Sequence, residues 1–296
     1  METQTFLFKP ELPYDLNLSL QRLKREPIYV FQEDAVYRTL KINRSLYLLK
    51  IHYQEQVNAE VKVEVACLKG TLESDKVRDM LERMLAIHCD LNDIYGYMNR
   101  IPELKPLTRN FEGLQLFQDP DLFETMMRLI IAQQITTSFA LELLRNLMEA
   151  ASKTVEYENQ PYSVFPNPSQ VAKLSLEDLT SRKFSGRKAE YVIDFAKLVR
   201  DGKIDLDELR GMSDEEVSKE LLKIRGVGPW TVSCLLLFAL GRNHSVPVSD
   251  IGVQKAIQQV YGRSKRPTKN EVLQLSDEWR PVGSYVTRYL WETLRA

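Results

Sequence analysis

The spacing of apolar and polar residues changes once along the chain, near residue 73. From about residue 28 to 68 the apolar residues are mostly β-branched or aromatic, and Val61, Val63 and Val65 alternate with Lys62 and Glu64. Alternation at every second position is typical of an antiparallel strand with one buried face. The N-terminal part is therefore expected to be an α+β domain built on an antiparallel sheet.

Beyond residue 73, apolar residues recur every three or four positions, as in "ESDKVRDMLERMLAIH" and "KAEYVIDFAKLV". This period predicts amphipathic helices, so the remainder of the chain is interpreted as all-helical. Ser213 and Glu216 form a capping box, and Pro120, Pro168 and Pro229 stand where helices could begin. The segment "EYENQPYSVFPNPSQ", residues 156–170, is predicted to be a loop because of its turn-forming residues.

The composition excludes several classes of function but does not select a single one. The 40 Lys and Arg residues against 41 Asp and Glu give a net charge of -1, so any nucleic-acid-binding face must be local. The three cysteines and three histidines are scattered, which argues against a disulfide framework and against a zinc or iron–sulfur site, and no cofactor is expected. The N-terminus lacks the features of a secretory segment and no long apolar run occurs, so a cytoplasmic soluble protein without a membrane partner is expected.

The stretch "LLKIRGVGPWTV" places a Gly-Val-Gly turn between two apolar helical segments. Gly226 and Gly228 free the backbone amides at the start of the second helix, and such amides form an anion site suited to one phosphate. The alternative is an ordinary helical connection that uses glycine as a C-cap. The turn does not match a dinucleotide-binding fingerprint, because Thr231 stands in place of the third glycine and no strand precedes it.

Two longer stretches, "LLKIRGVGPWTV" and "VPVSDIGVQKAI", together resemble the signature of the helix-hairpin-helix DNA glycosylases. The segments "FEGLQLFQDPDLFETMMRLIIAQQIT" and "FSGRKAEYVIDFA" are similar to two further stretches of the same family, in its 3-methyladenine DNA glycosylase II branch. The resemblance covers about residues 110 to 296 and is weaker in the N-terminal part. It implies an N-terminal α+β domain (1–95), a helical domain ending in the hairpin (115–241), and a second helical domain (96–114 plus 242–296).

The activity that this resemblance implies is removal of alkylated purines from duplex DNA in base excision repair, with the damaged nucleotide flipped into a cleft between the helical domains. Breaking an N-glycosidic bond builds positive charge on the deoxyribose, which a fixed carboxylate stabilises. Asp250 is the candidate for that carboxylate. Its alternative role is that of a helix N-cap at "SDIGV", which Ser249 could share.

Position 230 bears on the type of glycosylase. Members of the superfamily that resemble endonuclease III carry a lysine nucleophile at this point of the hairpin and cleave the strand, whereas this chain has Trp230. A monofunctional glycosylase without lyase activity is therefore expected. Trp230 and Trp291 are also candidates for stacking on a cationic methylated base. Tyr285 and Tyr289 lie four residues apart on the helix of Trp291 and are further pocket candidates, although such a stripe is more often core.

The sequence departs from the family at two pocket positions. Cys234 stands where a tyrosine is common, and Ile251 follows Asp250, so the shape of the base pocket and the preferred base stay open. By resemblance, Gln134 in "AQQIT" is preferred over Gln133 as the side chain that fills the gap left by a flipped base. The other expected DNA contacts are those of the hairpin and of one basic residue, namely Gly226, Val227, Gly228, Thr231 and Arg187.

The stretch "SRKFSGRKAE" carries Arg182, Lys183, Arg187 and Lys188 and either contacts phosphates or forms a solvated face. No side-chain metal site is expected, but the resemblance implies a cation held by the hairpin carbonyls of Ile224 and Val227. The expected partner is damaged double-stranded DNA, bound by a monomer. Two alternatives remain: a helix-hairpin-helix protein that binds DNA without chemistry, which would not need Asp250, and an oxidised-purine glycosylase, which Trp230 disfavours.

Overall fold

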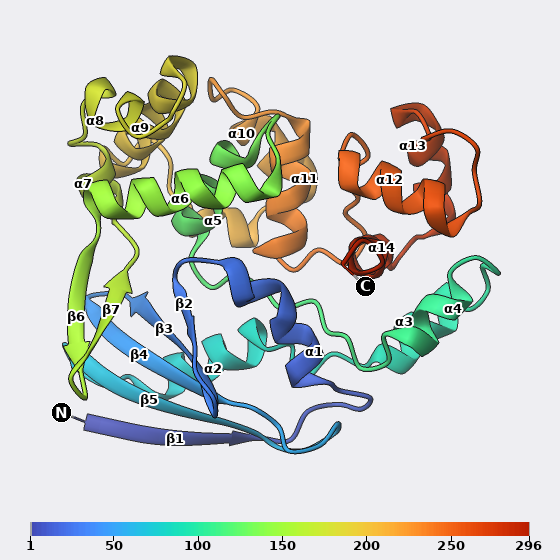
Figure 1. Cartoon of the computed structure of the whole chain (residues 1–296), viewed down its shortest axis with the longest axis horizontal. Helices are drawn as coiled ribbons and strands as arrows, with labels where there is room; N and C mark the ends of the chain where they lie inside the picture. The colour runs from blue at the N-terminus through green and yellow to red at the C-terminus, as the bar shows by residue number, and fades with distance from the viewer. Residues whose placement is uncertain (1, 296) are drawn as a thin grey trace.

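The computed structural model describes residues 2–295, in which a sheet domain precedes a larger helical part (Figure 1). The main sheet has five antiparallel strands in the order β1-β5-β4-β3-β2. In chain order the strands are β1 (Glu2–Phe8), β2 (Tyr29–Phe31), β3 (Ala35–Ile42), β4 (Ser45–His52) and β5 (Val61–Lys69). The expected fold class, an antiparallel α+β domain followed by helices, is confirmed.

The alternation in β5 separates the two faces of this sheet. Val61, Val63 and Val65 are fully buried, whereas Lys62 and Glu64 point to the other face and pair with each other at 2.6 Å. The valine face packs against α2 (Ser74–Met84), and the first helical elements, α1 (Leu16–Leu20) and η1 (Gln21–Arg25), belong to the same core.

The helical part begins after α2, and several of its helices start at the predicted signals. The Ser213–Glu216 capping box precedes α10, and Pro168 and Pro229 are the first residues of α7 and α11. No helix among residues 2–295 combines the length and apolar character needed to cross a membrane. The helices are α3 (Leu91–Met98), α4 (Lys105–Asn110), α5 (Leu122–Ala132), α6 (Thr137–Ala151), α7 (Pro168–Val171), α8 (Leu176–Thr180), α9 (Gly186–Arg200), η2 (Glu208–Gly211), α10 (Asp214–Leu221), α11 (Pro229–Phe238), α12 (Ile251–Val260), α13 (Lys269–Glu278) and α14 (Gly283–Glu292).

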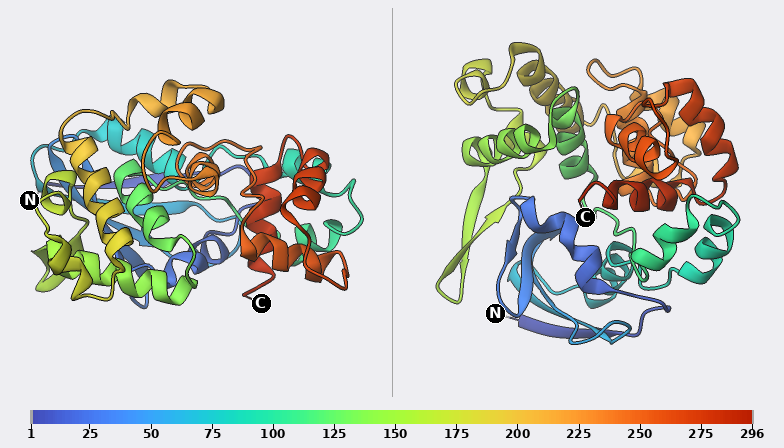
Figure 2. Two further views of the ribbon diagram at one scale, coloured as in Figure 1. Left: turned by 90° about the horizontal axis from the view of Figure 1, so that it is seen from above. Right: turned by 45° about the vertical axis from the view of Figure 1, so that its right-hand side comes forward.

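Two hydrophobic cores organise these elements. The first is shared by the inner face of the sheet, α2, α5, α6, α9 and most of α11. The second joins α3 and α4 to α12, α13 and α14, and both views of Figure 2 show these helices as one group beside the sheet. This second core begins at Leu91, slightly before the predicted limit at residue 96. The domain limits 1–95, 115–241 and 96–114 plus 242–296 stay a prediction.

A β-hairpin occupies the segment that was predicted to be a loop. Its strands are β6 (Lys153–Tyr157) and β7 (Gln160–Val164), and Glu158 and Asn159 between them have φ values of +50° and +61°. A two-residue hairpin turn needs such left-handed residues. The loop prediction for residues 156–170 is therefore wrong for residues 156–164, which belong to the hairpin, and from Pro168, where α7 begins. The all-helical interpretation beyond residue 73 is corrected at this hairpin.

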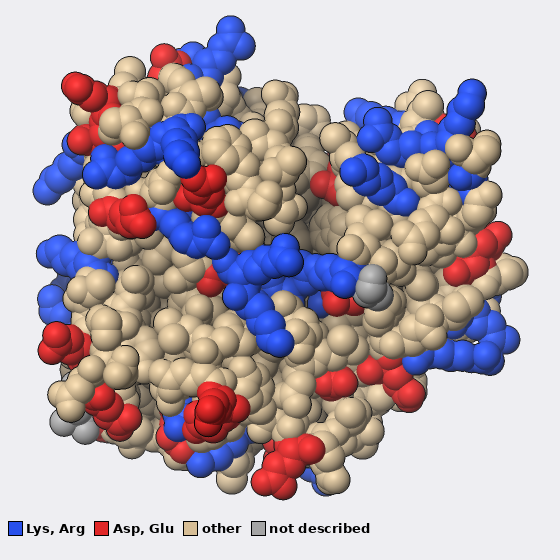
Figure 3. Space-filling model, viewed as in Figure 1, with Lys and Arg blue, Asp and Glu red and all other residues tan. Residues whose placement is uncertain are grey.

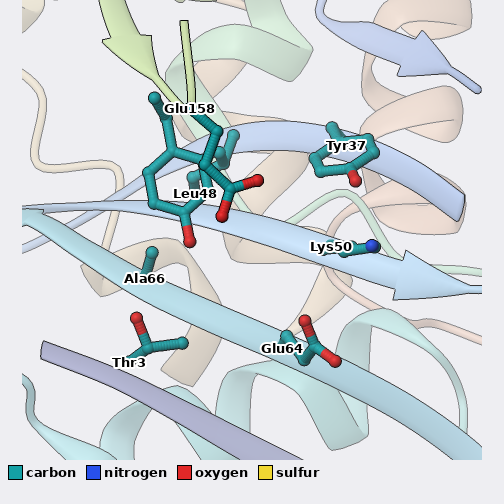
Figure 4. A pocket seen from close by; sticks show the side chains of 8 residues that line it. Thr3, Tyr37, Leu48, Lys50, Glu64, Ala66 and Glu158 are labelled. Carbon is teal, nitrogen blue, oxygen red and sulfur yellow. The ribbon is translucent and has the colours of Figure 1, made fainter. Parts of the chain in front are cut away.

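The hairpin covers the outer face of the main sheet. Tyr162 packs on Tyr37 of β3 with ring centroids 5.5 Å apart, and the hydroxyl of Thr39 donates to the Ser163 carbonyl at 2.7 Å. A cavity of about 60 Å³ remains between hairpin and sheet (Figure 4). Its lining residues are Thr3, Tyr37, Leu48, Lys50, Glu64, Ala66, Tyr157 and Glu158.

Buried ion pairs join the sheet domain to α5. Arg38 of β3 lies 2.9 Å from Glu124 of α5, and both side chains are almost completely buried. Arg38 also donates to the Tyr29 hydroxyl at 2.7 Å and lies over the Tyr29 ring. A buried charge that loses its partner lowers the free energy of unfolding, so the Arg38–Glu124 pair fixes the position of α5 on the sheet.

We expect Arg38→Met to lower the free energy of unfolding by about 3 to 5 kcal/mol, because Glu124 would lose its buried partner. Chemical denaturation of the two proteins measures the difference. Lys50→Met is the matched control, because Lys50 pairs with Asp34 at 2.9 Å on the surface and should contribute at most about 1 kcal/mol. Equal losses for both variants would contradict a structural role of the buried pair.

Candidate active site

The helix-hairpin-helix turn connects α10 to α11 and depends on Gly226. Gly226 has a φ of +89°, and a Cβ atom at this position would lie 2.4 Å from the Cγ atom of Tyr191. Gly228 has a φ of -117°, caps α11, and leaves open space where a Cβ would be. Only Gly226 therefore requires glycine for conformational reasons, and Gly228 provides an uncovered approach to the amides that begin α11.

Gln133 ties this turn to the end of α5. Its side-chain amide donates to the Gly226 carbonyl at 2.7 Å and to the Thr231 hydroxyl at 2.8 Å. The side chains of Thr231 and Val227 are buried, so only their backbone atoms are open to the predicted contact with DNA, which stays a prediction. Gln133 was the rejected candidate for the wedge, and its bonds to the hairpin explain why it faces inward.

The side chain of Gln134 faces solvent, unlike that of Gln133. It is exposed, and its φ of +59° puts it in the left-handed region that non-glycine residues seldom adopt. Lys188 of α9 holds the preceding turn by donating to the carbonyls of Ile130 and Gln133 at 3.2 and 3.0 Å, and burial lowers the pKa of Lys188. Lys188 therefore supports the loop from within the protein, whereas Arg187 beside it is exposed.

Asp250 has the N-cap role that the sequence offered as its alternative, and it also contacts both candidate tryptophans. As the N-cap of α12, it accepts the Val253 amide on Oδ1 at 2.8 Å. The Trp291 indole N–H donates to the same oxygen at 3.0 Å, and the Trp230 indole N–H donates to Oδ2 at 2.9 Å. The hairpin helix, α12 and α14 therefore meet at one carboxylate.

The three donors around Asp250 are all uncharged. Among residues 2–295, no Lys, Arg or His forms an ion pair with Asp250. Neutral N–H groups fix the direction of a carboxylate without cancelling its charge, so the charge stays available to a positive centre in front of it. Gly252 permits this arrangement, because a Cβ there would lie 2.9 Å from Oδ1 of Asp250 and 3.1 Å from the Trp291 indole nitrogen.

The surface is hollowed at this junction. Figure 3 shows a depression between the lobe of α5, α6 and α11 and the lobe of α12 and α13, with Lys and Arg side chains on both sides. Asp250, Trp230 and Trp291 are each only partly buried. These three residues therefore combine a fixed negative charge with aromatic surface that a ligand can reach.

Residues 127–281 match the family described as "HhH-GPD superfamily base excision DNA repair protein". The "DNA-3-methyladenine glycosylase" of Bacillus subtilis is 30% identical over 290 residues, which cover 96% of this chain and 95% of that protein. This chain belongs to the HhH-GPD superfamily, in its 3-methyladenine glycosylase branch.

Two solved structures share the fold of this glycosylase. The "3-methyladenine dna-glycosylase from Archaeoglobus fulgidus" superposes with a TM-score of 0.86 at 22% identity and covers 98% of each chain. The 8-oxoguanine glycosylase/lyase of Clostridium acetobutylicum, solved with double-stranded DNA, gives a TM-score of 0.77 at 18% identity and covers 99% of this chain and 97% of its own. Glycosylases of both alkylated and oxidised bases thus use this architecture.

Phe238 was missed by the sequence reasoning, although its spacing could have revealed it. It lies eight residues after Trp230 on α11, with Cys234 midway, so the three side chains follow one face of the helix. Its ring stacks on Trp291 with centroids 5.5 Å apart and planes 9° apart. Arg22 of η1 lies over the Phe238 ring at 5.2 Å from its centroid, which brings the sheet domain to the inner end of the site.

The predicted role of Tyr285 and Tyr289 in the pocket is wrong. Both side chains are buried in the second core, and the Tyr285 hydroxyl contacts Cys89 Sγ at 2.8 Å. The Tyr289 hydroxyl donates to the Leu114 carbonyl at 3.0 Å. The spacing of four put both on one face of α14, but that face points away from Asp250, toward α3 and α4.

The two positions that depart from the family differ in exposure. Cys234 is buried beneath the site, and burial together with the charge of Asp250 raises the pKa of its thiol, which stays protonated. Ile251 is 55% exposed at the first turn of α12 and adds apolar surface beside the carboxylate.

The cation predicted at the hairpin would use carbonyl oxygens only. The Ile224 carbonyl already accepts the Val227 amide at 3.0 Å, which leaves it a second lone pair. No group of three or more His, Cys, Asp or Glu residues among residues 2–295 could hold a metal ion. The carbonyl site of Ile224 and Val227 stays a prediction.

We expect Gly226→Ala to lower the free energy of unfolding by about 1 to 2 kcal/mol, because the left-handed backbone disfavours a Cβ and Tyr191 blocks it. Gly228→Ser is the control and should change stability by less than about 1 kcal/mol, since serine suits a helix N-cap. Chemical denaturation measures both, and binding to an undamaged duplex should weaken for Gly226→Ala. Unchanged stability and binding would show that the turn is only a connector.

Proposed function

We propose that this protein is a monofunctional DNA glycosylase that excises alkylated purines, the 3-methyladenine and 7-methylguanine class, from duplex DNA in base excision repair. The observation that carries this proposal is the single carboxylate of Asp250, held by two indoles next to the helix-hairpin-helix turn. We further propose that the protein acts as a monomer on damaged double-stranded DNA in the cytoplasm.

Binding begins at the phosphate backbone. The amides at the start of α11 and the positive end of its dipole attract one phosphate, and Gly228 leaves room for it. Gln134, exposed and held in a left-handed conformation above the Lys188 contacts, fills the gap that the flipped nucleotide leaves in the duplex. Arg187, also exposed, contributes a charge contact to the backbone.

Cleavage breaks the bond between C1′ of the deoxyribose and the base nitrogen, and the bonding electron pair leaves with the base. The sugar becomes positively charged, and the Asp250 carboxylate stabilises that charge. A water oxygen then bonds to C1′ and loses a proton, which Asp250 accepts or passes to solvent. Because only uncharged N–H groups hold Asp250, its full negative charge acts on the transition state.

The indoles of Trp230 and Trp291 present aromatic faces to the base. A purine methylated at N3 or N7 carries positive charge on its ring, which an aromatic face attracts by about 0.5 to 2 kcal/mol. Since Phe238 covers one side of Trp291, the opposite side and Trp230 remain for the base.

Two observations favour this function over the alternatives. A protein that only binds DNA has no need for a carboxylate held by two indoles, so Asp250 favours an enzyme. Position 230 carries tryptophan instead of the amine that a glycosylase/lyase uses to attack C1′, which favours hydrolysis without strand cleavage.

Asp250→Asn should reduce the single-turnover rate of base release by about 10²-fold or more, since one preorganised electrostatic partner contributes about 3 to 4 kcal/mol. The variant keeps an oxygen for the Val253 and Trp291 donors but loses the acceptor for Trp230, so stability should fall by about 1 to 2 kcal/mol. Hypoxanthine, a neutral leaving group, should be affected more than cationic 7-methylguanine. Quenched-flow release from both substrates provides the rates.

Duplex binding and thermal melting accompany these rates as controls. Binding should stay close to that of the unmodified protein, because removing a negative charge near phosphates does not weaken the ground state. Full excision by a folded Asp250→Asn protein would end the catalytic assignment. If the unmodified protein releases no damaged base, a DNA-binding module is favoured instead.

Incubation with an abasic duplex and borohydride should trap no covalent complex, because position 230 offers no amine to form a Schiff base. The gel should show neither an adduct nor a nicked strand. A known glycosylase/lyase serves as the positive control. A trapped adduct on Lys223 or Lys255 would overturn the monofunctional assignment.

A further inference from the structure

The stretch from residue 221 to residue 270 is almost free of negative charge. Asp250 is its only acidic residue, although 41 of the 296 residues of the chain are acidic. The stretch includes the hairpin turn, α11, the candidate catalytic carboxylate and α12. Its Lys and Arg residues are Lys223, Arg225, Arg242, Lys255, Arg263, Lys265, Arg266 and Lys269. Both sides of Asp250 along the chain are therefore basic.

The basic residues on the hairpin side of Asp250 already have partners. Lys223, Arg225 and Arg242 each form an ion pair with an acidic residue of α9 or α10, at 2.7, 2.6 and 3.1 Å. On the α12 side, Arg263 is the only basic residue in an ion pair among residues 2–295, with Glu271 at 3.1 Å. Unpaired positive charge therefore lies along α12 and at the start of α13.

The four unpaired residues, Lys255, Lys265, Arg266 and Lys269, are all exposed, and we call them the α12–α13 basic surface. Figure 3 shows Lys and Arg side chains over α12 and α13, where these helices border the depression. Lys255 lies four residues after Ile251, the exposed neighbour of Asp250, so both occupy one face of α12. The positive charge thus begins beside the carboxylate and continues along the helix.

Hydrogen bonds at both ends hold the loop between α12 and α13, residues 261–268. Gly262 has a φ of +60°, and the Arg263 amide donates to the Gln258 carbonyl at 2.9 Å, which closes the last turn of α12. Thr268 begins α13 with a capping box that it shares with Glu271. The backbone that carries the basic side chains is therefore fixed before any ligand arrives.

The basic residues do not stabilise this loop. Lys265, Arg266 and Lys269 follow one another closely, so their charges repel. Lys269 is the first residue of α13, where a positive charge opposes the helix dipole. A fixed group of like charges that gains nothing from the fold is suited to bind an anionic partner.

We propose that the α12–α13 basic surface is a second site for the phosphate backbone of duplex DNA, on the side of the depression opposite the hairpin. The proposal rests on the DNA-binding function proposed above and adds a contact surface to it. The ten residues of α12 span about 15 Å, which equals the axial rise of about four base pairs. The second contact therefore lies several nucleotides from the flipped one.

Two backbone contacts on different cores have a consequence for the damaged nucleotide. The hairpin belongs with the first core, whereas α12 belongs to the second. A duplex held at both places spans the depression, so the nucleotide between the contacts lies over Asp250. The α12–α13 basic surface thus positions the DNA and takes no part in breaking the glycosidic bond.

A triple variant, Lys265→Gln with Arg266→Gln and Lys269→Gln, removes three charges from exposed side chains, so the fold should persist. The matched control is Lys9→Gln with Arg44→Gln and Lys69→Gln. It also removes two lysines and one arginine, all exposed and all in the sheet domain. Thermal melting is recorded for the three full-length proteins, and binding to an undamaged labelled duplex is measured by fluorescence anisotropy at several salt concentrations.

We expect the slope of log affinity against log salt to become shallower by about two to three units in the triple variant, because each phosphate contact contributes about 0.9. Affinity at about 0.1 M salt should fall by about tenfold to a hundredfold. The single-turnover rate of base release with saturating protein should stay within about threefold, because phosphate contacts do not touch the reacting atoms. If the control changes the slope and the affinity as much as the triple variant, the basic surface is only solvated and the proposal is overturned.

Shortened duplexes separate a local contact from a general electrostatic field. Two duplexes are used, each ending about two base pairs from the damaged nucleotide on one side, which removes the phosphates that lie farther away on that side. One of the two should bind the unmodified protein more weakly than a full duplex does, with a much smaller loss for the triple variant, whose contact is already absent. Equal losses for both proteins on both duplexes would show long-range attraction and overturn the proposal.

The two proposals fail in different ways. If the unmodified protein binds duplex DNA but releases no damaged base, the glycosylase assignment fails, while the salt slopes still test the second backbone site. If the unmodified protein releases damaged bases but the triple variant binds with an unchanged slope, only the inference about the α12–α13 basic surface is overturned.

Discussion

The structure depends most on the hydrogen bonds that hold the carboxylate of Asp250. Its two oxygens accept one backbone amide and two indole N–H groups, contributed by α11, α12 and α14. A carboxylate in contact with a lysine or arginine would be held as firmly, but the positive charge of that partner would neutralise it. Neutral N–H donors orient the carboxylate and leave its negative charge uncancelled. A carboxylate needs both properties to stabilise a developing cation. The close approach of Gly252 and the N-cap geometry of α12 serve the same end.

The sequence predicted those parts of the molecule that depend on local geometry. The strand alternation around Val63, the capping box at Ser213 and the glycine turn at Gly226 all follow from interactions between residues close in the chain. The capping role of Asp250 is also local and could be predicted. Its hydrogen bonds to Trp230 and Trp291 could not, because these residues lie 20 and 41 positions away in the chain. Only the resemblance to a family connected those residues before the structure was known.

The errors have a common cause in contacts between distant segments. Tyr285 and Tyr289 share a helix face with each other but face α3 and α4, which no spacing along α14 could reveal. The β6–β7 hairpin is stabilised by Tyr37 and Thr39 of a strand more than a hundred residues earlier, so its turn-forming residues alone suggested a loop. The contact of Arg22 with Phe238 was not predicted for the same reason, because the two residues are far apart in the chain.

The hairpin on the outer face of the sheet has a mechanical consequence. It lies between α6 and α7, whose side chains share the first core with the inner face of the sheet, and it packs on the outer face of the same sheet, so the sheet and these helices form one packed body. The other body is the group of α3, α4 and α12–α14. Trp230 packs against the first body and Trp291 against the second, and both donate a hydrogen bond to the carboxylate of Asp250. Asp250 therefore bridges the two bodies, and a change in the distance between them would strain the hydrogen bonds that orient its carboxylate.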